Sequence, residues 1–364
     1  MGPSLIPSTS RSMIRLHSGV ALVVSLLAIT ACADDPDVPT QAPPVVGTTG
    51  GGNTPTTPTT PTTPLPQPTD PPLISSPFIV DTGATPGGRI VFSASNDFEM
   101  GLVQLESMRP DGSELTRITP TDVTRAGTPA WSPDDALIAY GTYGSGGWII
   151  ALIRPDGSAN RQLIKGDYPF WLADGRLGYH CNLTDLCAVE SSGANPTVLL
   201  RRTAGTPDMA FTLSPDGTMI AFVRFVANVR AEYSADDVHY TVWVMRRDGT
   251  GERRLTSTDS SVAMELDPTW SRDGKQIAFR SGELGIAVAD VDGGRLHSVS
   301  RAGEIQPSIG TGTPAWSPDG TKIIFGGDDG IFYIANADGS GLIRRVKAPM
   351  PGGYSAGSMA WSSR

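Results

Sequence analysis

The stretch Thr313 to Phe325, TPAWSPDGTKIIF, decides the fold of this 364-residue chain, because altered copies of it recur along most of the sequence. The residues around Trp316 have the apolar character of a short strand, Ser317 to Gly320 has turn chemistry, and Lys322 to Phe325 reads as a second strand. Proline presets φ near about −65°, aspartate can accept a hydrogen bond from the backbone ahead of it, and glycine accepts the positive φ of a tight turn. The unit is therefore a predicted β-hairpin.

The hairpin recurs at a regular spacing. Its tryptophan position falls at residues 131, 171, 213, 270, 316 and 361, with leucine at 213, so the intervals are 40, 42, 57, 46 and 45 residues. A second hairpin, with an apolar strand, a turn of the Asp-Gly type and a short strand, recurs between these positions. It occupies Val103–Thr119, Ile150–Ile164, Leu186–Leu200, Val242–Thr256, Ile286–Ser300 and Ile331–Val346. Four strands per unit, repeated in this way, are typical of a β-propeller.

The two ends of the repeat region complement each other. Arg89 to Phe92 matches the second strand of the unit and has no Trp-Ser-Pro-Asp before it, whereas the residues around Trp361 match a first strand with nothing after it. We therefore expect an all-β fold, a six-bladed β-propeller in which N- and C-terminal strands share one blade. This arrangement would also hide two open sheet edges. The repeated tryptophans are expected to pack between blades.

The pattern P-x-W-S-P-D-G-x-x-I-A-F, followed by an apolar strand and D-G-x-x-x-R-L-T, resembles the repeat of the TolB family of WD40-like periplasmic propellers. The resemblance covers residues 87–364 and implies a propeller that acts in the bacterial cell envelope. Members of that family carry an additional α/β domain before the propeller. Here a segment rich in proline and threonine occupies that place, and we expect no second globular domain.

Residues 1–31 have the features of a secretory signal. They contain Arg11 and Arg15 but no acidic residue, and their apolar run from Val20 to Ile29 is much shorter than the ~20 residues that a membrane-spanning helix needs. The run ends in Leu-Ala-Ile-Thr-Ala-Cys32, which resembles the bacterial lipobox and implies cleavage before Cys32 and acylation of that cysteine. A plain secretory signal with a chance cysteine is the alternative, and translation could also start at Met13.

The predicted anchor favours one membrane. Aspartates stand at Asp34 and Asp35 rather than directly after Cys32, and the resemblance to bacterial lipoproteins then favours the outer membrane, facing the periplasm or the cell surface. Residues 32–86 contain the run TPTTPTTPTTP from Thr54 to Pro64. Such a segment cannot bury enough apolar surface to order itself, and it favours extended polyproline II. We expect a disordered stalk that reaches about 100 Å at ~3.1 Å per residue.

The charge balance limits the partners. The chain has 28 basic and 37 acidic residues, a formal charge of −9, and loss of the two signal arginines gives 26 minus 37, or −11. A net acidic surface disfavours nucleic acid and anionic lipid headgroups as partners. Apart from the lipid anchor, the sequence indicates a monomer without a cofactor.

Two cysteines remain after lipidation. Cys181 and Cys187 flank five residues at the predicted junction of the second and third strands of a blade. Across such a hairpin their Cα atoms would lie about 4.5–5.5 Å apart, within the range that a disulfide requires. An oxidising envelope favours the disulfide. A zinc site with His180 and Asp185, or two free thiols, are the alternatives.

Catalytic motifs are weak. Gly353 to Gly357 fits G-x-S-x-G around Ser355, but a nucleophile elbow needs a following helix and later Asp and His residues, and neither residue type follows in this sequence. His180, His239 and His297 are too dispersed for a catalytic metal site. The motifs at Asp290 and Asn336 resemble calcium loops but lack the further ligands. We therefore predict no catalytic or metal-binding residue and a chain that is not an enzyme.

The longest interval contains an insertion, Arg224 to Tyr240, between the second and third strands of its blade. Such loops share a face with the connections between blades, and that face would also carry Asp97, Arg125 and Tyr143. Insertions on one face of a repeat array often form the binding surface. The candidate binding residues are Arg230, Glu232, Tyr233, Asp236, Asp237, His239, Asp328 and Asp329. The sequence favours a non-catalytic, protein-binding envelope lipoprotein. The alternative is a sensor of a small molecule or glycan, or a propeller enzyme, that uses the central channel.

Overall fold

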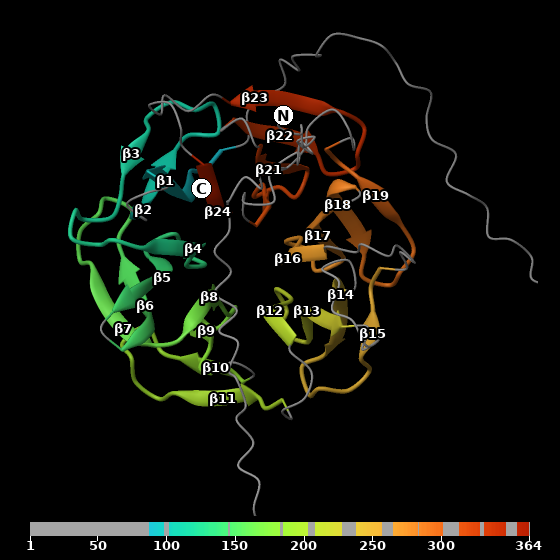
Figure 1. The fold of residues 1–364 in the computed structure, drawn as a ribbon, viewed down its shortest axis with the longest axis horizontal. Coiled ribbons are helices and arrows are strands. Elements are labelled where there is room, and N and C mark those ends of the chain that lie inside the picture. Colours follow the sequence, from blue (N-terminus) through green and yellow to red (C-terminus); the bar gives the residue numbers. More distant parts are fainter. Residues whose placement is uncertain are drawn as a thin grey trace, which may run out of the picture. The chain divides into compact units, whose positions relative to one another are not determined.

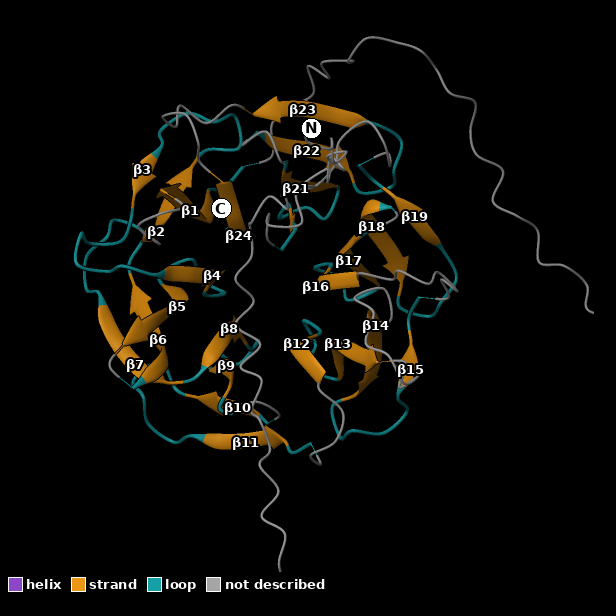
Figure 2. Cartoon of the chain, in the orientation of Figure 1, coloured by secondary structure: helices purple, strands orange, loops and turns teal. Residues whose placement is uncertain are grey.

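A computed structural model describes residues 87–97, 102–144, 146–182, 185–202, 208–227, 238–256, 265–282, 284–300, 313–327, 331–346 and 355–363. All regular secondary structure in these ranges is β-strand, and Figure 2 shows strands joined by loops. Among these residues, no helix is long and apolar enough to cross a membrane.

The strands form six antiparallel four-stranded sheets, which we number as blades. Blade 1 comprises β24 (Ser355–Trp361), β1 (Ile90–Asp97), β2 (Leu102–Met108) and β3 (Thr116–Arg117). Blade 2 comprises β4 (Ala126–Trp131), β5 (Ile138–Gly144), β6 (Gly147–Ile153) and β7 (Arg161–Lys165). Blade 3 comprises β8 (Asp167–Trp171), β9 (Leu177–His180), β10 (Leu186–Val189) and β11 (Thr197–Leu200).

The second half of the chain repeats this order. Blade 4 comprises β12 (Asp208–Leu213), β13 (Met219–Ala227), β14 (Val238–Arg246) and β15 (Arg253–Arg254). Blade 5 comprises β16 (Glu265–Trp270), β17 (Gln276–Ser281), β18 (Gly285–Asp290) and β19 (Leu296–Ser298). Blade 6 comprises β20 (Ala315–Trp316), β21 (Lys322–Gly326), β22 (Phe332–Asn336) and β23 (Leu342–Val346).

The six blades surround a central space. Figure 1 shows β4, β8, β12 and β16 nearest the middle, and β7, β11, β15 and β19 at the rim. This arrangement confirms the predicted fold class, a six-bladed β-propeller. The first strand of each blade, which we call the inner strand, therefore lines the centre of the ring.

Blade 1 is assembled from both ends of the repeat region. β24 pairs antiparallel with β1, and Ile90 lies opposite Trp361. Just beyond this pair, Ser362 N donates a hydrogen bond to Arg89 O at 2.9 Å. Apolar side chains of β1 and β24, including Ile90 and Met359, share one buried cluster with Phe332 of blade 6. Closure of the ring thus depends on strands that lie far apart in the sequence.

The Ser-Pro-Asp-Gly turn holds the repeated hairpin together by local hydrogen bonds. Ser317 Oγ donates to Asp319 Oδ1 at 2.6 Å, and the Lys322 amide donates to Ser317 Oγ at 2.9 Å. Gly320 has a φ of 71°, in the left-handed region that glycine adopts without a Cβ clash. The same serine–aspartate pair recurs at Ser214 and Asp216. This local chemistry explains why the motif marks each blade.

The core lies between blades, and the tryptophans belong to it. Trp316 is 8% exposed and shares a cluster with Val288 and Val299 of blade 5 and Phe325 of blade 6. Its indole N–H also donates to Thr269 O on the inner strand of blade 5 at 3.1 Å. Equivalent bonds run from Trp270 to Thr212 O and from Trp171 to Ala130 O, each at 3.1 Å. The predicted packing of the tryptophans between blades is therefore confirmed.

The interface between blades 3 and 4 is built differently, because leucine replaces tryptophan at position 213. Asp208 is 3% exposed. Its carboxylate accepts a hydrogen bond from Arg224 Nε at 2.8 Å and forms a salt bridge with Arg202. The Arg224 guanidinium also lies 4.5 Å from the centre of the Trp243 ring. The salt bridge from Arg202, which follows β11, thus joins blade 3 to blade 4, whereas the hydrogen bond and the cation–π contact of Arg224 lie within blade 4 and hold Asp208 in place.

Candidate functional site

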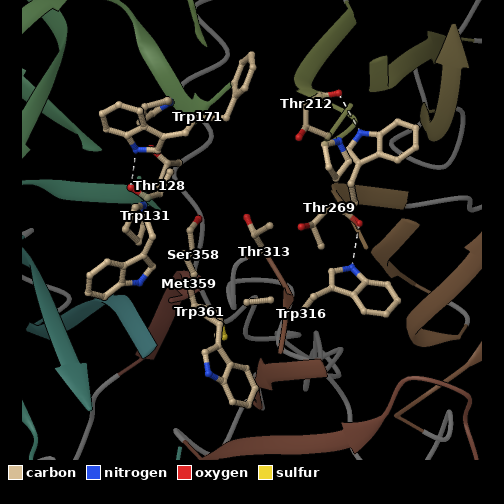
Figure 3. Close-up of a pocket in the computed structure, with 18 of the residues that line it drawn as sticks. Thr128, Trp131, Trp171, Thr212, Thr269, Thr313, Trp316, Ser358, Met359 and Trp361 are labelled. Atoms are coloured by element: carbon tan, nitrogen blue, oxygen red, sulfur yellow. Dashed lines mark hydrogen bonds between the residues drawn. The ribbon is translucent and has the colours of Figure 1, made fainter. Parts of the chain in front are cut away.

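The inner strands enclose a cavity of about 650 Å³. Each blade contributes residues that precede its tryptophan or leucine and residues of the segment that follows, and Figure 3 shows Thr128, Thr269, Thr313 and Ser358 arranged around the opening. The tryptophan indoles extend from this wall toward the neighbouring blades (Figure 3). Hydroxyl, aromatic and carboxylate side chains therefore form the wall of the channel.

A ring of backbone bulges shapes this wall. Four residues at the same repeat position have left-handed backbones: Thr128 (φ 48°), Tyr168 (49°), Ala210 (52°) and Asp267 (56°). The pairing register of the inner strand shifts beside each of them. This region is uncommon for residues with a side chain, above all β-branched or bulky ones. Bulges re-aim side chains, and strained backbones cluster at functional sites. All four residues line the cavity.

Sequence reasoning missed this ring, although a signal was present. Pro129, Pro169 and Pro268 each follow a left-handed residue directly, inside a predicted strand. Within sheets, proline is confined to edge strands, strand starts and bulges. Proline stands at this position in four repeats, Pro314 included, and therefore indicates a bulge at the inner edge of the blade.

The wall carries acidic side chains at blades 2 and 5, Asp135 and Asp267. Asp267 stands 3.1 Å from Arg280 Nη2, and its side chain remains 24% exposed. Burial raises the pKa of Asp267, and the charge and hydrogen bond of Arg280 oppose that rise. Tyr168 is 40% exposed. Burial, aided by the nearby carboxylates of Asp267 and Asp167, raises the pKa of Tyr168 to about 12. Tyr168 thus stays a neutral phenol that can donate a hydrogen bond into the channel.

Behind Tyr168 lies a buried histidine. His180 is 6% exposed, and its Nε2 accepts a hydrogen bond from the Phe211 amide at 3.2 Å. Its Nδ1 stands 3.7 Å from Asp167 Oδ1, and the Tyr168 ring centre lies 5.2 Å from the imidazole centre. Burial lowers the pKa of His180 to about 4 and raises the pKa of Asp167 to about 6. The packed surroundings thus favour the neutral form of both groups.

These two pKa shifts predict opposite pH dependences. The folded pKa of Asp167 is raised, so its contribution to stability is complete below the unfolded value of about 4 and is lost as pH rises through about 6. The folded pKa of His180 is lowered, so its contribution is complete above about 6.5 and is lost as pH falls toward about 4. In the wild-type chain the pH dependence that Asp167 gives to the free energy of unfolding therefore offsets the one that His180 gives.

We expect Asp167→Asn to remove that offset. The free energy of unfolding of the variant should fall more steeply than that of the wild type between about pH 6.5 and 4, because only the His180 dependence remains. Urea unfolding at several pH values measures both slopes. Equal slopes for the two chains would show that Asp167 titrates at its ordinary value in the folded state.

Most predicted binding residues lie outside the described residues. These are Arg230, Glu232, Tyr233, Asp236, Asp237, Asp328 and Asp329, together with the lipidation candidate Cys32. His239 pairs with Val226 in the β13–β14 ladder, and nothing is described of its side chain. Of the other residues expected on the same face, Tyr143 is 54% exposed and Arg125 forms a backbone bridge with Val103.

The other candidate sites are found on several blades. A disulfide joins Cys181 and Cys187, whose Cα atoms are 5.7 Å apart. Neither cysteine is therefore a free thiol. His297 lies on the outermost strand of blade 5, and its Nε2 is 2.9 Å from Ala337 O. Ser355 lies in β24, opposite Ser95. In the part of the chain that the structure describes, no three His, Cys, Asp or Glu side chains are placed to hold a metal ion.

The ring of blades and the lined channel define a six-bladed β-propeller. Comparison with known proteins shows which other propellers it resembles. The Tol-Pal system protein TolB of Anaeromyxobacter dehalogenans (strain 2CP-C) is 32% identical over 138 residues, which cover 35% of this chain and 27% of that protein. The match thus spans about a quarter of that relative. No family model matches the chain.

Solved structures agree on the fold. TolB from Acinetobacter baumannii superposes with a TM-score of 0.59 at 18% identity, covering 77% of this chain and 67% of that one. A chain of the nidogen/laminin complex gives a TM-score of 0.54 at 11% identity, covering 76% of this chain and 100% of that one. The propeller is thus similar in sequence to part of one TolB and in fold to another.

Proposed function

We propose that this chain is a non-catalytic cell-envelope protein whose propeller binds a protein partner on one face, at the mouth of the channel. The observation that carries the proposal is the ring of strained inner-strand residues around the 650 Å³ cavity. Strain of this kind persists only where the surrounding structure over-determines it, and it clusters at active sites and ligand-binding sites. The TolB-like repeat adds support, because the similar protein of Anaeromyxobacter dehalogenans is a Tol-Pal system component.

The topology supports the choice of one face for this binding. Neighbouring strands are antiparallel, so the start of each inner strand and the hairpin between the second and third strands lie at the same end of a blade. We call this end the channel face. The segment 228–237, which holds five of the candidate binding residues, joins β13 to β14 at this face. Long connections on one face of a repeat array commonly form its binding surface.

A second candidate function rests on the acidic channel wall. Asp135 and Asp267 line the cavity, burial raises the pKa of Asp267, and carboxyl groups with shifted pKa values in a cavity are candidates for ligand contact. A small molecule or glycan in the channel would use these groups. Such a ligand would bind without the segment 228–237, which separates the two functions experimentally.

Photo-crosslinking tests the protein-binding proposal. Benzoylphenylalanine replaces Tyr168, a half-exposed ring in the channel wall, in the full-length chain in its own cells. The control carries the same group in place of Ala194, which is exposed in the β10–β11 turn at the opposite end of blade 3. We expect a discrete protein adduct from position 168 alone. The absence of a protein adduct at 168, or equal adducts at both positions, would overturn the proposal.

We further propose that residues 1–31 are a lipoprotein signal peptide, that Cys32 carries the lipid, and that residues 32–86 are a stalk holding the propeller away from the outer membrane. The lipobox-like sequence before Cys32 and the proline-rich composition support this. We expect Cys32→Ser to move the chain from the membrane fraction to the soluble fraction and to abolish incorporation of an alkynyl fatty acid. A variant that keeps its label would contradict acylation at Cys32.

A further inference from the structure

Two aromatic side chains stand exposed on the channel face of blade 2. Tyr143 and Trp148 lie opposite each other across the β5–β6 hairpin, with exposed fractions of 54% and 46%. Their ring centres are 5.7 Å apart and the ring planes meet at 86°, an edge-to-face pair. The pair keeps both rings in a defined position while much of each ring remains open to solvent. Among the described residues, only four large hydrophobic side chains are at least 40% exposed. Tyr143 and Trp148 are two of them, and Tyr168 at the channel wall is a third.

The hairpin end leaves the rings accessible. Its backbone is rich in glycine, at Gly141, Gly144, Gly146 and Gly147. A Cβ placed on Gly141 would lie 3.1 Å from Thr128 Oγ1 and 3.9 Å from Trp148 Cε3. Trp148 and Thr128 therefore approach the same glycine. Thr128 is one of the left-handed residues that line the cavity, so the aromatic pair lies next to the cavity wall without itself lining the cavity.

A cation accompanies the pair. Lys165 is exposed at the end of β7, and its Nζ is 3.1 Å from the position that a Cβ on Gly146 would take. Among the described residues, no salt bridge reaches Lys165. Its ammonium group therefore lies at the same hairpin end as the aromatic pair. It is complementary to a carboxylate on an incoming partner.

We propose that Tyr143 and Trp148 are the aromatic anchor of the partner-binding surface, and that Lys165 selects a protein segment presenting an apolar side chain beside an acidic one. This inference rests on the proposed protein-binding function and locates its energetic centre. Tryptophan and tyrosine dominate interface hot spots because they bury a large area with few rotatable bonds. Rim charges such as Lys165 mainly steer the encounter and discriminate between partners.

The test uses the chain with benzoylphenylalanine at position 168, so that the photoreactive group does not replace either anchor ring. In that background we expect Trp148→Ala and Lys165→Glu each to reduce the yield of the protein adduct by at least about tenfold. Trp148→Tyr should retain most of the yield. The matched control is Val198→Ala, because Val198 is also 46% exposed but lies on β11, the outer strand of blade 3. The control should leave the yield unchanged.

The outcomes separate this inference from the function it rests on. If the adduct forms and Trp148→Ala leaves it unchanged while the thermal midpoint is also unchanged, the anchor is refuted and the binding function stands. If no protein adduct forms in any background, the binding function fails and the anchor with it. If the captured species resists protease but is cleaved by a glycosidase, the pair binds a glycan, and the protein assignment is overturned.

Discussion

Trp316→Ala is expected to lower the free energy of unfolding by about 3–5 kcal/mol. The indole fills the interface between blades 5 and 6, where it is 8% exposed and packs with Val288 and Phe325. Alanine would leave a cavity among these apolar side chains and would remove the donor to Thr269 O. The loss of packing and the loss of the hydrogen bond add, because the Thr269 carbonyl group would lose its protein partner at the same place.

Urea unfolding followed by far-ultraviolet circular dichroism measures this loss. Trp316→Phe is the informative control, because it keeps an aromatic ring but no N–H donor, so its loss should fall between those of the wild type and Trp316→Ala. Val198→Ala, at an exposed site, should have little effect. An unfolding midpoint for Trp316→Ala within error of the wild type would show that the tryptophans are not the wedges between blades.

Removal of residues 350–364 is expected to prevent formation of a closed propeller. This truncation deletes β24, the inner strand of blade 1, and exposes the β1 edge that carries Ile90 and Phe92. It also removes Met359 from the cluster that joins blade 1 to blade 6. An unpaired hydrophobic edge favours aggregation. We expect the truncated chain to lose its cooperative thermal transition and to elute in aggregated form.

A matched deletion of residues 33–76 removes more chain but none of the described strands. This control should keep the thermal midpoint of the full-length chain, because the deleted segment is expected to lie outside the propeller core. A truncated chain without residues 350–364 that remained a stable monomer with an intact β signal would refute the shared blade.

The fold was predictable because its signal is local and repeated. Each Ser-Pro-Asp-Gly turn carries its own hydrogen bonds, such as that from Ser317 to Asp319, so the hairpins can be located from short windows of sequence. The regular spacing of these windows then fixes the number of blades. The pairing of β24 with β1 follows from counting strands at the two ends.

The site was less predictable, because it depends on contacts that no short window contains. The exchange of tryptophan for leucine at 213 is visible in the sequence, but the salt bridge from Arg202 to Asp208 at the same interface is not. Trp148 lies in an apolar run that resembles a buried strand, and only its place at a hairpin end exposes it. The left-handed backbone of Tyr168 likewise depends on the bulge that surrounds it.

The central claim is that the channel face of the propeller binds an envelope protein. In-cell crosslinking of the full-length chain, followed by mass spectrometry, tests it most directly when compared with a chain whose residues 228–237 are replaced by a short Gly-Ser linker that keeps β13 and β14 joined. We expect one defined envelope protein to be captured by the full-length chain and lost from the linker variant. Capture of no protein by either chain, or equal capture by both, would contradict the claim.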